Sequence, residues 1–142
     1  MEICTRAVRS LEDYKRLLEA MALAEPDLRP YYNRNDFYRA MRCRWWLAMH
    51  AESPAGICAL SIASTIATLE MCVVLPPHRG QGLQRHLIRR RVEAAKAEGC
   101  TSVETWTYRS NAVSARNLIA CGFEERAGPA GDRARRYWQF AP

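Results

Sequence analysis

Apolar residues along the chain recur at helical spacing in some segments and at strand spacing in others, and each change of period marks an expected element. Residues 2–8 are β-prone, and Ser10, with an acidic residue one turn later, resembles a helix capping box. The helix that begins there is expected to end before Pro26. Residues 27–35 are predicted to be loop, and a short helix is predicted over 37–41.

Three apolar runs in the middle of the chain are predicted to be strands. Residues 45–49 and 57–66 have strand character, and the turn-forming residues 52–56 between them indicate a hairpin. Residues 68–74 form the third strand, with side chains that alternate between two largely covered faces. The two alternating sets are Leu69, Met71 and Val73 on one face and Glu70, Cys72 and Val74 on the other.

Helical spacing returns after two consecutive prolines, in a helix that begins near Leu83 and whose C-cap glycine is Gly99. A strand is predicted over 102–107, and Asn111 can cap a further helix. The last two strands are expected at 123–126 and 137–140. The order β-α-α-β-β-β-α-β-α-β-β predicts one mixed α/β domain over residues 1–142, with a crossover helix between parallel strands.

Composition narrows the class of protein without choosing a function. The 142 residues fit one domain, and 21 basic against 15 acidic residues give a net charge of +6. This charge favours an anionic partner, which leaves nucleic acid, a membrane surface and a phosphate-rich cofactor open. Six scattered cysteines form no metal-binding motif and suit a reducing compartment. No signal peptide is apparent, so a cytoplasmic location is expected.

The longest uncharged stretch of the chain is residues 53–69. It has 17 residues and contains several serines and threonines. A helix needs about 20 apolar residues to cross a bilayer. We therefore expect this stretch to form buried strands, and we expect no membrane partner.

The most informative chemistry lies between the third strand and the following helix, in Arg79-Gly80-Gln81-Gly82. The two glycines let the backbone curl, so that amides at a helix N-terminus can approach an anion closely. This pattern favours a phosphate or pyrophosphate site, with Arg79 as an added cation. The sequence fits neither a Walker loop nor a dinucleotide fingerprint, and the plainer alternative is a simple strand-to-helix turn.

Two blocks of sequence resemble the GNAT N-acetyltransferase superfamily. Its acyl-CoA signature V-x-P-x-x-R-G-x-G matches Val74, Pro76, Arg79, Gly80 and Gly82. The family's N-x-x-A…GF helix is similar to the segment from Asn111 to Phe123, with Ser114, Ala115, Leu118 and Gly122. The resemblance covers nearly the whole chain in order, and it implies a GNAT-like fold.

The resemblance further implies acetyl-CoA as cosubstrate and assigns residues to it. The backbone of the strand end would pair with the pantetheine arm, and an amide near Val73 would hold the thioester oxygen. Loop amides would cradle the pyrophosphate, Asn111 would lie along the pantetheine, and Arg116 would meet the nucleotide or be a plain solvated arginine. The strand residues are Cys72, Val73 and Val74, and the loop residues are Arg79, Gly80, Gln81, Gly82, Leu83 and Gln84.

The implied activity is transfer of an acetyl group to a primary amine by direct attack in a ternary complex. Glu70 is the candidate general base; otherwise it orients the substrate or pairs with an arginine. The family's usual acid is a tyrosine at the position of Leu118, which is a departure here. Tyr108 is a substitute acid, or else an aromatic that shields the cofactor, and water is a further alternative.

Two other functions compete with the enzyme. A GNAT-like protein could bind acyl-CoA as a regulator without turnover, as Leu118 suggests. The arginines at 89–91 and near the C-terminus could mark a nucleic-acid module, but three consecutive arginines spread around a helix rather than forming one stripe. The expected acceptor is a small-molecule or peptide amine, and dimers are common in the family.

Overall fold

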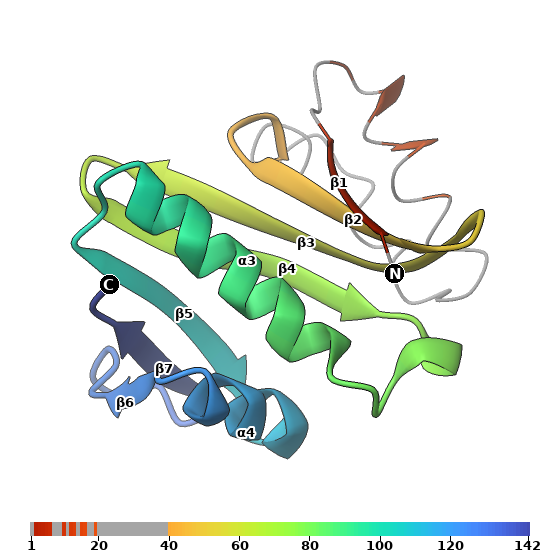
Figure 1. Cartoon of the computed structure of the whole chain (residues 1–142). Coiled ribbons are helices and arrows are strands. Elements are labelled where there is room, and N and C mark those ends of the chain that lie inside the picture. The colour runs from red at the N-terminus through yellow and green to blue at the C-terminus, as the bar shows by residue number, and fades with distance from the viewer. Residues whose placement is uncertain (1, 7–9, 11, 14, 17–18, 20–39) are drawn as a thin grey trace.

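A seven-stranded sheet with the order β1-β2-β3-β4-β5-β7-β6 forms the framework of the described chain (Figure 1). The computed structural model describes residues 2–6, 10, 12–13, 15–16, 19 and 40–142. All neighbouring strands are antiparallel except β4 and β5, which are parallel. The strands are β1 (Glu2–Arg6), β2 (Arg44–His50), β3 (Ser53–Ala63), β4 (Ile66–Val74), β5 (Ser102–Tyr108), β6 (Glu124–Arg126) and β7 (Arg135–Phe140).

The crossover between the parallel strands contains the short 3-10 helix η2 (Pro76–His78) and the helix α3 (Leu83–Ala97). Helix α4 (Ala112–Ala120) follows β5, and both α-helices cover the same face of the sheet (Figure 1). Gly99 has a φ of +79°, the left-handed conformation of the C-cap glycine that the sequence predicts. The crossover helix and the mixed α/β class are likewise confirmed.

The sheet separates two apolar clusters. The cluster beneath α3 and α4 includes Leu87, Ile88, Val103, Leu118 and Trp138. The cluster on the opposite face includes Ala40, Trp45, Leu47, Ile57, Ala59 and Leu75. Both faces of the central strands are therefore covered, as expected for strands with few charges.

The N-terminal predictions are tested only in part, because residues 7–9, 11, 14, 17–18 and 20–39 lie outside the described residues. The amide of Asp13 donates to the hydroxyl of Ser10 over 3.1 Å, which is the predicted capping contact. The described positions from 12 to 19 are helical. The loop predicted over 27–35 and most of the helix predicted over 37–41 fall outside this part of the chain. No helix of the described chain is long and apolar enough to cross a bilayer.

The hairpin between β2 and β3 is tighter than the sequence predicts. Its strands pair as far as His50↔Ser53, so the chain reverses at residues 51–52 and the predicted turn over 52–56 is wrong. Gly56 lies inside β3. A Cβ at this position would come within 3.1 Å of the Val73 carbonyl oxygen and 3.2 Å of a Leu83 methyl group. This glycine permits close packing against α3 rather than a turn.

A second turn also differs from the prediction. The strand expected over 57–66 ends at Ala63, and the chain reverses at residues 64–65 before β4 begins. Ser64 adopts a φ of +57°, the left-handed conformation that tight hairpin turns require. A small polar residue tolerates this conformation, so a turn forms in an apolar run that contains no glycine or proline.

Strand β4 contains a bulge that breaks the predicted alternation. Between the pairs Leu60↔Leu69 and Cys58↔Cys72, β3 advances two residues and β4 advances three. The extra residue lies at 70–71, where two residues of β4 oppose one of β3. Leu69 consequently belongs to the same apolar cluster as Cys72, whereas the sequence pattern placed them on opposite faces.

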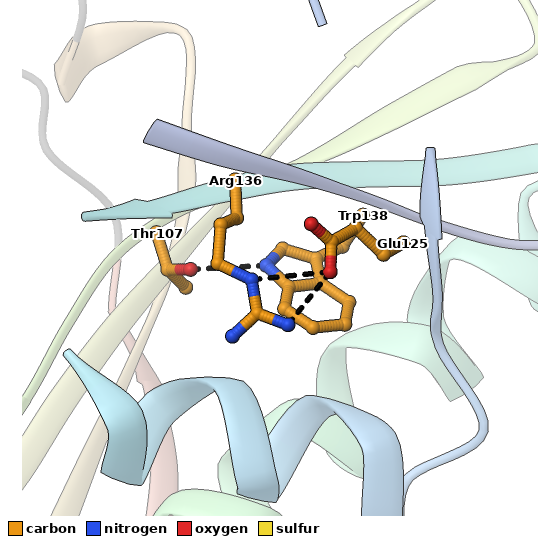
Figure 2. Close-up of polar contacts among 4 residues, drawn as sticks. All are labelled: Thr107, Glu125, Arg136 and Trp138. Atoms are coloured by element: carbon orange, nitrogen blue, oxygen red, sulfur yellow. Dashed lines mark hydrogen bonds and ion pairs between the residues drawn. The ribbon is translucent and has the colours of Figure 1, made fainter. Parts of the chain in front are cut away.

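The outer part of the sheet is held by side-chain contacts around Trp138 (Figure 2). The indole Nε1 of Trp138 donates to the hydroxyl of Thr107 over 3.0 Å. The guanidinium of Arg136 lies 4.7 Å from the centre of the indole ring and forms an ion pair with Glu125 over 2.6 Å. These contacts tie β6 and β7 to β5, which forms one wall of the site described next.

Candidate functional site

Strands β4 and β5 pair over a short stretch and then diverge (Figure 1). Their last paired residues are Thr68 and Glu104. One residue further, the hydroxyl of Thr105 donates to the carbonyl of Leu69 over 3.0 Å. Beyond this contact β4 continues along β3 and β5 continues along β7, so the facing edges open into a V-shaped gap between the two strands.

A cavity of about 420 Å³ occupies this opening. It is lined from β4, β5, α3 and α4, and from residues 40–45 on the opposite side. The cavity brings together six of the residues that the resemblance assigns to the cofactor or to catalysis: Glu70, Cys72, Val73, Gln84, Tyr108 and Asn111. Leu118, at the position of the family's usual acid, also lines the cavity. Positions 70 and 108, the two candidate catalytic residues, therefore share one cavity.

The glycine loop stands at the N-terminus of α3. Gly80 and Gly82 have φ values of +74° and +82°, and a Cβ at either would meet no atom within 4 Å. Their need for glycine is therefore conformational, and the space beside them is open. In the described chain, the amides of residues 80–83 donate to no backbone carbonyl, and Gly82 caps α3 without a side-chain bond. These exposed donors and the helix dipole favour an anion.

Arg79 makes backbone contacts within its own segment. Its amide donates to the carbonyl of Pro76 over 3.2 Å, and its Nε donates to the carbonyl of Val74 over 2.8 Å. The side-chain nitrogen of Gln81 donates to the carbonyl of Pro77 over 3.3 Å. The set of amides that donate to no backbone carbonyl in the described chain thus begins at Gly80, one residue later than the sequence analysis expects.

A polar network that the sequence analysis missed joins α3 to α4. The Gln84 side chain donates to the hydroxyl of Ser114 over 2.9 Å and accepts from the side-chain nitrogen Nδ2 of Asn117 over 2.7 Å. The Nε of Arg85 donates to the side-chain oxygen of Asn117 over 2.8 Å. The side chain of Gln84 therefore braces the two helices, in addition to the backbone role that the sequence suggests. Its partners lie 30 and 33 residues away, and no local signal marks them.

Asn111 lies where α4 meets the cavity. Its side-chain oxygen accepts from the amide of Ser114 over 3.1 Å, and its own amide donates to the carbonyl of Tyr108 over 2.9 Å. This is the N-cap that the sequence predicts. Arg116, further along α4, is exposed and does not line the cavity.

Glu70 lies at the bulge of β4, half-buried. Leu69 and Leu60 belong to the cluster beneath α3, so the next residues, Glu70 and Ser61, point to the opposite face. There the Ser61 hydroxyl donates to the Glu70 carboxylate over 2.8 Å. The carboxylate therefore has a defined orientation on the face away from α3.

Tyr108 is 54% exposed at the end of β5. Its ring meets that of Trp106 edge to face, with centroids 5.0 Å apart, and the guanidinium of Arg135 lies 4.4 Å from the Trp106 ring centre. Leu118, by contrast, is only 4% exposed and packs in the apolar core. Of these two positions, only Tyr108 carries a group that can donate a proton.

Two cysteines face each other across β3 and β4 at the cavity. Burial raises the pKa of Cys58 to about 12, and burial likewise raises the pKa of Cys72, although the nearby Arg91 charge opposes both shifts. Both thiols therefore stay protonated near neutral pH. Cys72 lines the cavity but has the wrong protonation state for a nucleophile.

Comparisons with known proteins agree with this geometry. The family model for the acetyltransferase (GNAT) family matches residues 6–123. The fold is similar to the PaiA N-acetyltransferase of Thermoplasma acidophilum in complex with coenzyme A (TM-score 0.76, 17% identity, all of both chains). It is also similar to a Bacillus subtilis acetyltransferase in complex with CoA (TM-score 0.75, 16% identity, 99% of this chain and 98% of the other).

A third solved structure has a similar fold, the ribosomal-protein-S18-alanine N-acetyltransferase of Escherichia coli. Its TM-score is 0.73 at 17% identity, with 99% of this chain and 94% of the other covered. No curated protein is significantly similar to this chain in sequence. The family model covers most of the chain, and the chain therefore belongs to the GNAT acetyltransferase family.

Proposed function

We propose that this protein transfers an acetyl group from acetyl-CoA to a primary amine by direct attack in a ternary complex. The observation that carries the proposal is the continuity of the site. The cavity at the opening between β4 and β5 is lined by Glu70, Tyr108 and Gln84, and the amides of residues 80–83, which donate to no backbone carbonyl in the described chain, directly precede Gln84 at the N-terminus of α3. One elongated ligand with an anionic end suits this arrangement.

The residues present fit acetyl-CoA. The amides of residues 80–83 would hold the diphosphate, where the open space beside Gly80 and Gly82 admits it. The edge of β4 from Cys72 to Val74 would pair with the pantetheine amides as an added strand would. Asn111, at the mouth of α4, would border the arm. Arg116 would meet the nucleotide end from the exposed side of α4.

The chain's own groups then supply proton transfer and charge stabilisation. Bound acetyl-CoA provides an activated acetyl carbon and a thiol leaving group. The amide near Val73 would stabilise the oxygen that gains charge. Glu70 would accept the proton of the amine, a role worth about 10²–10⁴ in rate. Tyr108 would donate a proton to the departing sulfur, whose thiol has an ordinary pKa of about 8.5.

Direct attack is favoured over an acyl-enzyme by the state of Cys72. Burial raises the pKa of this thiol, which lines the cavity, so the thiolate needed for a covalent intermediate is scarce. The amine and acetyl-CoA would accordingly occupy the site together.

Thiol release from acetyl-CoA across a panel of amines tests the proposal, together with calorimetry of CoA binding. We expect micromolar-range binding and release of CoA that depends on one class of amine. Absence of CoA binding would contradict the proposal.

A second candidate function is a non-catalytic acyl-CoA-binding protein, which is favoured by one observation. Leu118, buried in the core, leaves the position of the family's usual acid without a titratable group. This alternative predicts CoA binding without thiol release for any amine. Turnover with a single amine excludes it.

A further inference from the structure

Arg91 is the buried member of three consecutive arginines on α3. Its side chain is 2% exposed, whereas Arg89 and Arg90 are exposed. Successive helix positions differ by about 100°, so one residue of such a run faces inward while its neighbours face solvent. The sequence analysis expects the three arginines to spread around the helix, and the structure shows that Arg91 is the one that faces the sheet.

The guanidinium of Arg91 donates only to backbone carbonyls in the described chain. Its Nη1 donates to the carbonyl of Ala59 over 3.1 Å and to that of Glu70 over 3.2 Å. Its Nε donates to the carbonyl of Leu87, one turn earlier on α3, over 3.2 Å. Among the described residues it forms no ion pair with a carboxylate.

Both sheet carbonyls lie at the bulge of β4. Residues 70–71 oppose Ala59 there, and a bulge disrupts the local ladder of hydrogen bonds. Buried carbonyls without a donor are unfavourable, so an inserted donor stabilises the irregular backbone. Arg91 supplies that donor from α3 and joins the helix to both strands at one point.

A buried cation is a costly way to fill core space, since an apolar side chain of similar volume packs there more favourably. A planar guanidinium, however, presents several donors in a fixed arrangement, which a lysine or an apolar residue does not. The contacts of Arg91 thus point to a requirement for the shape of the bulge. The residue that this shape aims is Glu70, whose carbonyl binds Arg91 and whose carboxylate binds Ser61 on the other face.

We propose that Arg91 is a positioning residue for acetyl transfer. By holding the carbonyls of Ala59 and Glu70, it fixes the peptide of the bulge. That peptide sets the direction of the Glu70 carboxylate. Arg91 lines the cavity from α3, but its guanidinium donates to backbone carbonyls, so it acts through this backbone and not through contact with the amine. The inference rests on the proposed function for its kinetic consequence, but its structural part stands alone.

The test compares Arg91→Met, Arg91→Lys and the exposed control Arg90→Met. Amide hydrogen exchange at residues 59 and 69–73 reports on the bulge, and calorimetry with CoA reports on the glycine loop. Thiol release with acetyl-CoA, using the fastest amine of a panel, gives kcat and KM.

In Arg91→Met we expect exchange at the bulge to rise by about tenfold or more, while exchange at residues 103–107 changes little. We expect kcat to fall by about 10²-fold, as for a small misplacement of reacting groups, with a smaller change in KM. The Kd for CoA should stay within about twofold, because Arg91 lies in the second half of α3 and the loop stands before its first residue. Arg91→Lys should recover part of the loss, and Arg90→Met should match the wild type.

Native exchange at the bulge in Arg91→Met would overturn the structural part, and native kcat would overturn the positioning role. A parallel loss of CoA affinity would also overturn it, because Arg91 would then act on the whole site. If Arg91→Met fails to fold, Arg91→Lys decides in its place: native exchange and kcat contradict the proposal, and local loosening with reduced kcat supports it. If the wild type does not bind CoA, only the proposed function is contradicted. The hydrogen-exchange data still test whether Arg91 holds the bulge.

Discussion

The hydroxyl of Ser61 on β3 donates a 2.8 Å hydrogen bond to the carboxylate of Glu70 on β4. This bond holds a carboxylate at the bulge, on the face of the sheet away from α3, at the wall of the cavity. A general base needs such an orientation before it needs a tuned pKa. The pair therefore gives the proposed base a defined orientation at the wall of the cavity.

Replacing Glu70 by Gln should lower turnover more at neutral pH than at high pH. The amide keeps the shape and the bond from Ser61 but cannot accept a proton. An alkyl amine with an ordinary pKa near 10.4 is mostly protonated at pH 7 and needs the base, whereas at pH 10 much of it is already neutral. We expect a loss of about 10²-fold or more near pH 7 that shrinks as the pH rises. Steady-state pH profiles of thiol release measure this.

Ser61→Ala is the matched control for that experiment. It removes the orienting bond and leaves the carboxylate, so we expect a small loss in kcat that is similar at every pH. A pH-independent loss in Glu70→Gln would assign Glu70 to substrate orientation instead of proton transfer.

Replacing Gly82 by Glu should weaken CoA binding strongly. Gly82 has a φ of +82°, and the space beside it is open, so the new side chain would enter the region where the diphosphate would bind. Like charges about 4 Å apart repel by roughly 1–4 kcal/mol, so we expect affinity to fall about tenfold or more. Calorimetry with CoA measures the change.

Gly131→Glu provides a close control. Gly131 has a φ of +83° and equally open space, but it lies in the loop between β6 and β7. Both variants carry the same backbone strain and the same added charge, so only the position differs. Equal affinities in the two variants would remove the glycine loop from the CoA site.

The sequence predicts those parts of the site that depend on the backbone conformation of a residue and its near neighbours. Gly80 and Gly82 need left-handed conformations, and Asn111 caps a helix through the amide three residues on. Each of these demands is met by the residue itself and its immediate neighbours. Sequence spacing therefore predicts both the loop and the cap.

The parts that the sequence does not predict depend on partners far along the chain. The bulge at 70–71 exists only in relation to the register of β3, so a strict two-residue period misplaces Leu69 relative to Cys72. The sequence analysis assigns Gly56 to a turn. Its structural role is a close approach to Leu83, and that contact is with a helix 27 residues later in the chain. Arg91 belongs to a charge run whose usual place is the surface, and only the packed helix shows which member faces the sheet.

Replacing Tyr108 by Phe should lower kcat while leaving CoA affinity unchanged. The ring would keep its edge-to-face contact with Trp106, and only the hydroxyl would be lost. A thiol is a tolerable leaving group near neutrality, so we expect a loss near the low end of the range for general acids, about 10²-fold or less. An unchanged kcat would reassign Tyr108 to shielding the cavity. Thiol release and calorimetry on one preparation separate these outcomes.

Asp132 lies in the loop between β6 and β7, and its carboxylate accepts three hydrogen bonds. The hydroxyl of Tyr137 donates to its carboxylate over 2.6 Å, and the amides of Ala134 and Arg135 donate over 3.1 and 3.2 Å. The Tyr137 bond is the main reason that the pKa of Asp132 is lowered, with the backbone bonds adding to it. A lowered folded pKa means that this carboxylate stabilises the fold above its unfolded pKa, about 3.9, and that the stabilisation is lost as the pH falls through the folded value.

Tyr137→Phe should therefore raise the pKa of Asp132 toward its ordinary range without fully restoring it, because the two backbone bonds remain. Carboxyl NMR titration of the folded protein measures this shift directly. The acid limb of stability should also change, with the variant losing less stability than the wild type between about pH 4 and the folded pKa of Asp132. Tyr108→Phe, which removes a hydroxyl from a different tyrosine, should leave this titration unchanged. An unaltered Asp132 titration in Tyr137→Phe would show that the backbone amides and the charge of Arg135 depress its pKa without the tyrosine.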